Sequence, residues 1–181
     1  MKKSNVVLIY YMFKHSHIVF ALKNSRYELQ KIHLKKPYGF VAPTFPFLEG
    51  YEEEILIEEL CKSASAMSLE ITAFNFCGDH VHAIIRSEST SISAKIGSWK
   101  GKTAYDFNRR INPSVILQAA VKSDGTKQSL WAKGFFQKYI DTDEQLSQTI
   151  HYIKNNRIKH GLPSLSEGSL AYIDKLTAHV N

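Results

Sequence analysis

The order of strand-like and helix-like segments is the feature that most constrains the fold of this 181-residue chain. Short runs rich in β-branched and aromatic residues predict strands, and apolar residues spaced three and four apart predict helices. In chain order, the predicted segments are strands at 6–13 and 17–22 (one strand or two), a helix at 51–67, strands at 69–76 and 81–85, a helix at 91–110, strands at 115–121 and 130–140, and a helix at 143–160. This order predicts an α+β fold: a ferredoxin-like (split βαβ) antiparallel sheet with helices packed on one face.

The length fits one main domain, since single cores usually extend over about 100–200 residues. We expect this domain at 1–165, with a turn-rich insertion at about 24–50 and a C-terminal tail at 166–181 that can form a short helix. No apolar run approaches the roughly 18 residues that cross a bilayer, and the two cysteines lack a CxxC spacing. A soluble, cytoplasmic protein without membrane contact is therefore expected.

The positive charge is concentrated in the second half of the chain. Residues 1–90 carry 10 basic and 10 acidic side chains, whereas residues 91–181 carry 13 and 7, which accounts for the whole net charge of +6. Trp99, Trp131 and several other aromatic residues are interleaved with these charges. A basic surface with aromatic residues can neutralise phosphates and stack bases, so nucleic acid is a candidate partner.

Two histidines with a spacing of two residues form the sharpest local pattern. On a strand, His80 and His82 project from the same face while Val81 packs behind them. Two imidazoles can bind a divalent ion, but catalysis needs a third protein ligand and open coordination positions. The alternative is a pair of surface histidines on an edge strand. The segment His15–His17 has the same spacing, but its central residue is polar, and we expect it to take no part.

A tyrosine and an asparagine on the helix at 143–160 form the second pattern. Tyr152 and Asn156 are four residues apart and therefore lie on one face of that helix. A phenolate can attack phosphorus while a metal polarises the phosphate, and an amide oxygen can serve as a further metal ligand. The alternative is a half-buried tyrosine that makes one hydrogen bond.

Both patterns resemble a known family. The run Asp79-His80-Val81-His82 is similar to the His-hydrophobic-His motif of HUH endonucleases, in the form typical of single-tyrosine transposases of insertion sequences. The downstream segments look like the end of the REP-associated tyrosine transposases, and the basic helix of that family is similar to Lys100–Thr103. These downstream segments are 131–136, 143–146 and 152–162. The resemblance covers roughly residues 51–162.

The resemblance implies an HUH fold and a transposase that nicks and rejoins single-stranded DNA next to a hairpin. Tyr152 is implied as the nucleophile that forms a 5′-phosphotyrosine, with His80 and His82 as catalytic metal ligands and Asn156 completing the site for Mg²⁺ or Mn²⁺. Members of the family act as monomers or homodimers, and the sequence leaves this open. Basic residues are expected to contact the DNA: Lys95, Lys102, Arg109, Arg110, Lys133, Lys154, Arg157 and Lys159.

The sequence also departs from the family pattern and leaves alternatives. Arg157 stands where the family commonly has a proline, and the segments 24–50 and 111–129 are atypical. Tyr139 is the rival nucleophile. Two other functions are considered: a non-catalytic, ferredoxin-like module that binds single-stranded nucleic acid, and a different metal-dependent hydrolase that uses His80 and His82 and stays active without Tyr152.

Overall fold

The structure is a computed structural model that describes residues 13–23, 25, 48, 50–88, 91–111 and 129–178. Most of the strand expected at 6–13, the strand expected at 115–121 and most of the insertion expected at 24–50 lie outside these residues. Within the described part of the chain, no helix has the length and apolar character needed to cross a membrane.

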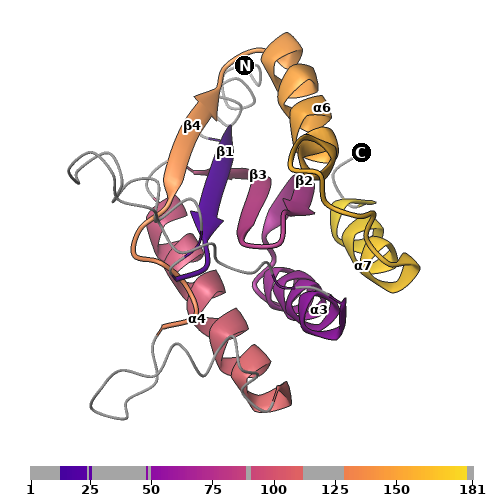
Figure 1. Cartoon of the computed structure of the whole chain (residues 1–181). Coiled ribbons are helices and arrows are strands. Elements are labelled where there is room, and N and C mark those ends of the chain that lie inside the picture. Colours follow the sequence, from indigo (N-terminus) through magenta and orange to yellow (C-terminus); the bar gives the residue numbers. More distant parts are fainter. Residues whose placement is uncertain are drawn as a thin grey trace, which may run out of the picture.

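A four-stranded antiparallel sheet forms the centre of the molecule (Figure 1). Its strands are β1 (Phe13–Ala21), β2 (Glu70–Phe76), β3 (His80–Glu88) and β4 (Phe136–Ile140). They are arranged in the order β2-β3-β1-β4, so that β1 and β3 are central. The strand expected at 130–140 is thus shorter than predicted, and Trp131 forms only an isolated bridge with Leu22.

The helices begin and end close to their predicted bounds. They are α3 (Gly50–Ala66), α4 (Ile92–Arg110), α6 (Asp143–Lys159) and α7 (Glu167–Thr177). The side chain of Thr142 caps α6 by accepting a hydrogen bond from the backbone N–H of Gln145. The chain order and the antiparallel sheet confirm the predicted α+β, ferredoxin-like fold class.

The larger part of the core lies between α3, α4 and one face of the sheet. Trp99 of α4 is fully buried there, and its indole N–H donates a hydrogen bond to the carbonyl of Leu60 in α3 (2.9 Å). Its ring packs edge-on against Phe20 of β1. Helix α7, which falls in the predicted C-terminal tail, contributes Leu176 to the same core.

Helix α6 packs on the opposite face of the sheet, so the expectation that all helices share one face is wrong for this helix. Its Ile153 forms a second, smaller core with Ala73, Ile84 and Ile140. Successive side chains of a strand alternate between faces, so Ile84 points away from the core that holds its neighbours. The amide of Asn75 adds a hydrogen bond to the carbonyl of Ile153 (2.7 Å). This placement brings α6 over the face that carries His80 and His82.

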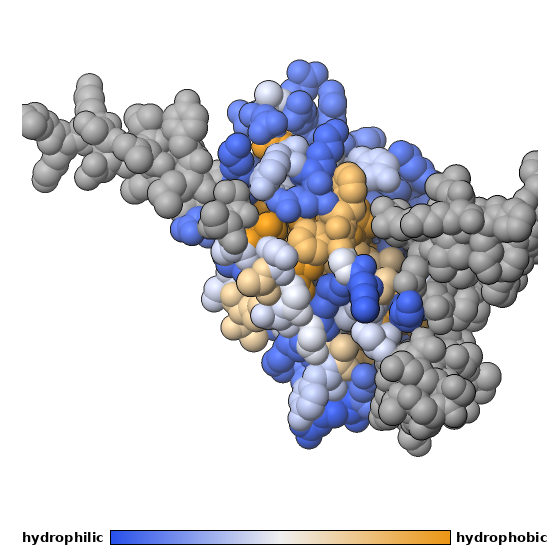
Figure 2. Space-filling model, turned by 90° about the vertical axis from the view of Figure 1, so that its left-hand side faces the viewer, coloured by the Kyte–Doolittle hydropathy of each residue, from blue (hydrophilic) through white to orange (hydrophobic). Residues whose placement is uncertain are grey.

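Strand β4 is one edge of the described sheet, and its Phe136 and Tyr139 are exposed. Figure 2 shows the side of the molecule on which β4 and α4 lie. Hydrophobic surface gathers in a band across its middle, and hydrophilic side chains cover both ends.

Candidate active site

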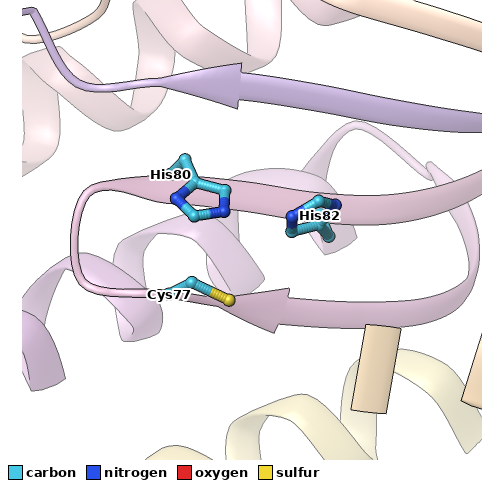
Figure 3. Close-up of side chains that lie close together, drawn as sticks. All are labelled: Cys77, His80 and His82. Carbon is cyan, nitrogen blue, oxygen red and sulfur yellow. The ribbon is translucent and has the colours of Figure 1, made fainter. Parts of the chain in front are cut away.

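The β2–β3 hairpin positions the two predicted metal-binding histidines. His80 and His82 project from the same face of β3, and both are buried. At the corner of the hairpin, Gly78 has a φ of +75°, a conformation that glycine adopts without strain. The backbone N–H of Cys77 then donates to the carbonyl of His80 (2.8 Å). In Figure 3, Cys77 therefore faces the two imidazoles from the end of the neighbouring strand.

A carboxylate orients the His80 ring. The Oδ1 atom of Asp79 lies 2.6 Å from His80 Nδ1, and both side chains are buried. A metal-binding histidine usually directs its second ring nitrogen to such a carboxylate, which sets the tautomer and the ring orientation. The contact therefore favours Nε2 of His80 as the atom that faces a metal.

A third histidine, His17, orients His82. Its Nε2 lies 3.0 Å from Nδ1 of His82, and the two rings stack with centroids 5.2 Å apart. Burial, together with the neighbouring His80, His17 and His160, lowers the pKa of His82 from 6.5 to about 2. His82 is thus neutral at physiological pH, which is the form that binds metals.

The expectation that His15–His17 takes no part is wrong for His17. The segment lies within β1, whose register pairs His17 with Ile84 and Val19 with His82. Antiparallel partners point to the same face, so His17 shares the face of His82. The signal that could have identified it is the pairing of β1 with β3, which brings these two HxH patterns together.

Tyr152 of α6 lies against the histidines. Its ring is edge-on to His82, with centroids 5.6 Å apart, and to His17, with centroids 6.0 Å apart. The residue is 37% exposed. Lys159 lies two turns further along α6, and its Nζ atom is 4.4 Å from the centroid of the Tyr152 ring. The structure therefore brings the predicted nucleophile to the predicted histidines.

The rival nucleophile, Tyr139, points the other way. The register of β1 and β4 pairs His17 with Lys138 and Ser16 with Tyr139. Because neighbouring residues of a strand alternate between faces, Lys138 shares the histidine face and Tyr139 points to the opposite one. This geometry favours Tyr152 over Tyr139.

Asn156 lies one turn beyond Tyr152 and is buried beside Cys77. Its Nδ2 donates to Cys77 Sγ over 3.5 Å. Burial raises the pKa of the Cys77 thiol to about 12. One donor atom from each of Cys77, His80 and His82 lies within 4.8 Å of the other two, which is the geometry of a possible metal site. Cys77 was not among the predicted site residues.

Arg157 is buried in the fold rather than presented to solvent. It is 6% exposed, and its guanidinium pairs with the carboxylate of Glu53 in α3 at 2.6 Å and 3.3 Å. It also donates to the carbonyls of Phe76 and Pro163. A guanidinium held in this way does not reach DNA phosphates, so the expected DNA contact does not fit this geometry. The helix continues to Lys159, which a proline at this position would hinder.

The other predicted basic residues fall into two groups. Lys154 and Lys159 share α6 with Tyr152 and are exposed, as is Lys133 before β4. The remaining four are on α4, which packs on the opposite face of the sheet: Lys95, Lys102, Arg109 and Arg110. Among these, Lys102 pairs with Asp106, and Arg110 pairs with Glu58 and Glu59 of α3.

A pocket of about 530 Å³ adjoins Tyr152 between β4 and α6. The rings of His17 and Phe136 both line this pocket, and they are edge-on to each other with their centroids 6.3 Å apart. Lys138 adds a positive charge. Exposed aromatic rings beside cationic side chains are the combination that holds single-stranded nucleic acid. The lining includes His17, Phe136, Lys138, Gln145, Thr149 and Tyr152.

One protein family and two solved structures are similar to this chain. The family model described as "Transposase IS200 like" matches residues 13–156. No curated protein matches the sequence. Among solved structures, the REP-associated tyrosine transposase bound to a REP hairpin is similar with a TM-score of 0.50 and 16% identity, over 83% of this chain and 70% of that one. This likeness supports the predicted HUH fold. A candidate transposase from Deinococcus radiodurans R1 has a TM-score of 0.49 and 16% identity, over 79% and 90% of the two chains.

Proposed function

The chain belongs to the family of IS200-like transposases, and on that premise we propose that it nicks and rejoins single-stranded DNA with Tyr152 as the nucleophile. One observation carries the proposal: the Tyr152 ring lies against His82 and His17, on the face of the sheet where the candidate metal ligands converge. Helix α6 packs on the sheet of its own chain, and we propose that the site is completed within one chain.

In the proposed reaction, the phenolate oxygen of Tyr152 attacks the scissile phosphorus. The bond from phosphorus to the 3′ oxygen breaks, and the departing strand takes up a proton as its 3′-hydroxyl. The other strand stays linked through its 5′ phosphate to Tyr152. Attack of a 3′-hydroxyl on this linkage rejoins DNA, so a single tyrosine serves both directions.

The proposed metal ligands are His80 and His82, and Asn156, which the family resemblance implied as a third ligand, lies beside them through its contact with Cys77. A divalent ion such as Mn²⁺ or Mg²⁺ would polarise the scissile phosphate when bound. The donor set fits an ion because one donor atom from each of His80, His82 and the neighbouring Cys77 lies within 4.8 Å of the other two, all three side chains are buried, and Asp79 and His17 each contact an Nδ1 atom of the two histidines. The proposed nucleophilic role of Tyr152 does not depend on which divalent ion is bound.

We further propose that unpaired nucleotides next to a hairpin occupy the pocket beside Tyr152. The exposed ring of Phe136 can stack on a base, and Lys138 of the lining and Lys159 beside the Tyr152 ring can contact phosphates. Lys154 lines a different pocket and would contact DNA further from Tyr152. Support for a hairpin substrate comes from the similar transposase, whose structure contains a REP hairpin. The predicted basic residues of α4 and Lys133 would contact DNA away from the cleavage point.

The test is a denaturing-gel assay with labelled single-stranded DNA that carries a hairpin and varied flanking sequence, in Mn²⁺ or in EDTA. We expect a covalent protein–DNA adduct with the wild type in Mn²⁺, no adduct in EDTA, and none with Tyr152→Phe. Tyr139→Phe is the matched control and should form the adduct as the wild type does.

Two outcomes would contradict the proposal. Cleavage that persists in Tyr152→Phe would assign the reaction to water or to another nucleophile, as in the hydrolase alternative. DNA that is bound but never cut across a broad set of substrates would favour the non-catalytic binding module.

A further inference from the structure

The side chain of Cys77 lies on the metal-binding face of the sheet. Asn75 pairs with His82 in the β2–β3 register and shares its face, and Cys77, two residues further on, returns to the same face. The thiol is fully buried beneath the imidazoles and does not face solvent. Figure 3 shows the sulfur directed toward the two rings.

The distances suit a single ion. The donor atoms of Cys77, His80 and His82 lie within 4.8 Å of one another. Around a tetrahedral Zn²⁺ ion, with bonds of about 2.0–2.3 Å, neighbouring ligand atoms stand about 3.5 Å apart. Side-chain rotation can supply the remaining closure of roughly 1 Å, and the hydrogen bond from the Cys77 N–H to the His80 carbonyl keeps the hairpin closed.

The surroundings of the histidines match those of metal ligands. Asp79 contacts Nδ1 of His80, and His17 contacts Nδ1 of His82. Outer partners on both Nδ1 atoms direct both Nε2 atoms to a shared centre. The side-chain amide of Asn156 is engaged with the Cys77 sulfur, because its Nδ2 donates to Sγ. An N–H group in that position stabilises a thiolate and acts as an outer partner of the third ligand.

We infer that Cys77, and not Asn156, is the third protein ligand of this site, and that the site therefore prefers a thiophilic transition ion, Zn²⁺ or Co²⁺, to Mg²⁺. Thiolate and imidazole ligands select Zn²⁺ and similar ions, whereas Mg²⁺ requires oxygen ligands in octahedral geometry. Coordination releases the thiol proton to solvent. Three protein ligands leave a fourth position for a phosphate oxygen, as in catalytic zinc sites. The inference rests on the metal site of the proposed function.

The test is a titration of the full-length protein with Co²⁺, followed by absorption spectroscopy. We expect tetrahedral Co²⁺ bands in the visible region and a thiolate-to-Co²⁺ charge-transfer band in the near ultraviolet. Cys77→Ala should remove the charge-transfer band and weaken Co²⁺ binding by at least about 100-fold, since loss of an outer partner alone costs up to that much. Cys61→Ala is the matched control, because Cys61 is the other buried cysteine and lies on α3, in the core on the opposite face of the sheet. It should keep both the band and the affinity.

The ligand assignment has its own decisive comparison. Asn156→Ala should keep the charge-transfer band, whereas Cys77→Ser, which preserves the size of the side chain, should lose it. If Cys77→Ala binds Co²⁺ like the wild type while Asn156→Ala does not, the third ligand is Asn156 and the inference is overturned. Circular dichroism of each variant checks that the fold is intact.

The result is independent of the proposed nucleophile. Tyr152→Phe should show the same Co²⁺ spectrum as the wild type. A charge-transfer band without any covalent DNA adduct would uphold the ligand and contradict the proposed function. A covalent DNA adduct in Mn²⁺ from a protein that shows no charge-transfer band with Co²⁺ would support the proposed function and contradict Cys77 as a ligand.

Discussion

His17 lies between the two halves of the site, with its ring stacked on His82 and edge-on to Tyr152. Its Nε2 is the partner of His82 Nδ1 at 3.0 Å. We expect His17→Phe to keep the aromatic packing but to weaken divalent-metal binding by about 10–100-fold, because His82 loses the partner that orients its ring. Calorimetric titration with Mn²⁺ measures this affinity.

The control for this prediction is His15→Phe, a change on the same strand two residues away. It should leave metal affinity unchanged. His17→Gln should recover part of the affinity, since an amide oxygen can accept the proton from Nδ1 of His82. Equal metal affinity in all three variants would mean that the contact does not orient His82.

Spacing alone could predict only those site residues that share one element. His80 and His82 on a strand, and Tyr152 and Asn156 on a helix, follow from periods of two and of 3.6 residues. His17 and Cys77 join the site through strand pairing and a hairpin corner, which bring together segments that local patterns treat separately. Arg157 was predicted to contact DNA because it is a basic residue near Tyr152. The structure instead buries it against Glu53, a contact that local sequence patterns do not reveal.

At the scale of elements, the Arg157–Glu53 pair fastens α6 to α3 at an end of the sheet. The guanidinium contacts Glu53 and two backbone carbonyls, and both partner side chains are buried. We expect Arg157→Met to lower the free energy of unfolding by about 3 kcal/mol, because it leaves the Glu53 carboxylate buried without its cation. Urea unfolding followed by circular dichroism measures the change.

Lys154→Met is the control for this variant, since Lys154 is an exposed residue of the same helix. Its effect should stay within about 0.5 kcal/mol. The double variant Arg157→Met with Glu53→Met should be more stable than Arg157→Met alone, because it also removes the buried carboxylate that has lost its contact with Arg157. A loss below about 1 kcal/mol in Arg157→Met would show that water screens this pair.

The bounds of α3, α4 and α6 followed from hydrophobic periodicity, but the face on which each helix packs did not. Helix α6 has an apolar stripe like the others, and nothing in that stripe distinguishes one face of the sheet from the other. Its side is set by the non-local contacts of Ile153 with Ala73 and Ile84 and by the hydrogen bond from Asn75. This choice of face is what makes an active site possible, because it places Tyr152 over the histidines.

Across the whole molecule, the sheet separates two chemical environments. One face meets α6 and carries the histidines, Tyr152 and the adjoining pocket. The other meets α3 and α4, where ion pairs such as that of Arg110 with Glu58 and Glu59 join the two helices. Glu58 of α3 illustrates this: it contacts Lys62 at 2.5 Å, Arg110 of α4 at 2.8 Å and the hydroxyl of Tyr172 in α7 at 2.9 Å.

This cluster predicts how stability depends on pH. Burial alone would raise the pKa of Glu58, but the hydrogen bonds from Lys62, Arg110 and Tyr172 outweigh it and lower the pKa from 4.5 to about 2. A carboxylate whose pKa is lower in the folded than in the unfolded chain stabilises the fold above its unfolded pKa. That contribution is lost as the pH falls from about 4.5 towards 2.

We therefore expect Glu58→Gln to lower the free energy of unfolding by about 1 kcal/mol at pH 7, a modest value because solvent partly screens the cluster. The difference from the wild type should shrink through pH 4 and be small at pH 2.5, where the pH approaches the folded pKa of Glu58 and the wild-type carboxyl begins to take up a proton. Urea unfolding at pH 7, 4 and 2.5 measures it. Glu54→Gln, an exposed position on the same helix, is the control and should track the wild type. A deficit in Glu58→Gln that stays constant across this range would assign the effect to packing of α3, α4 and α7 rather than to the charge of Glu58.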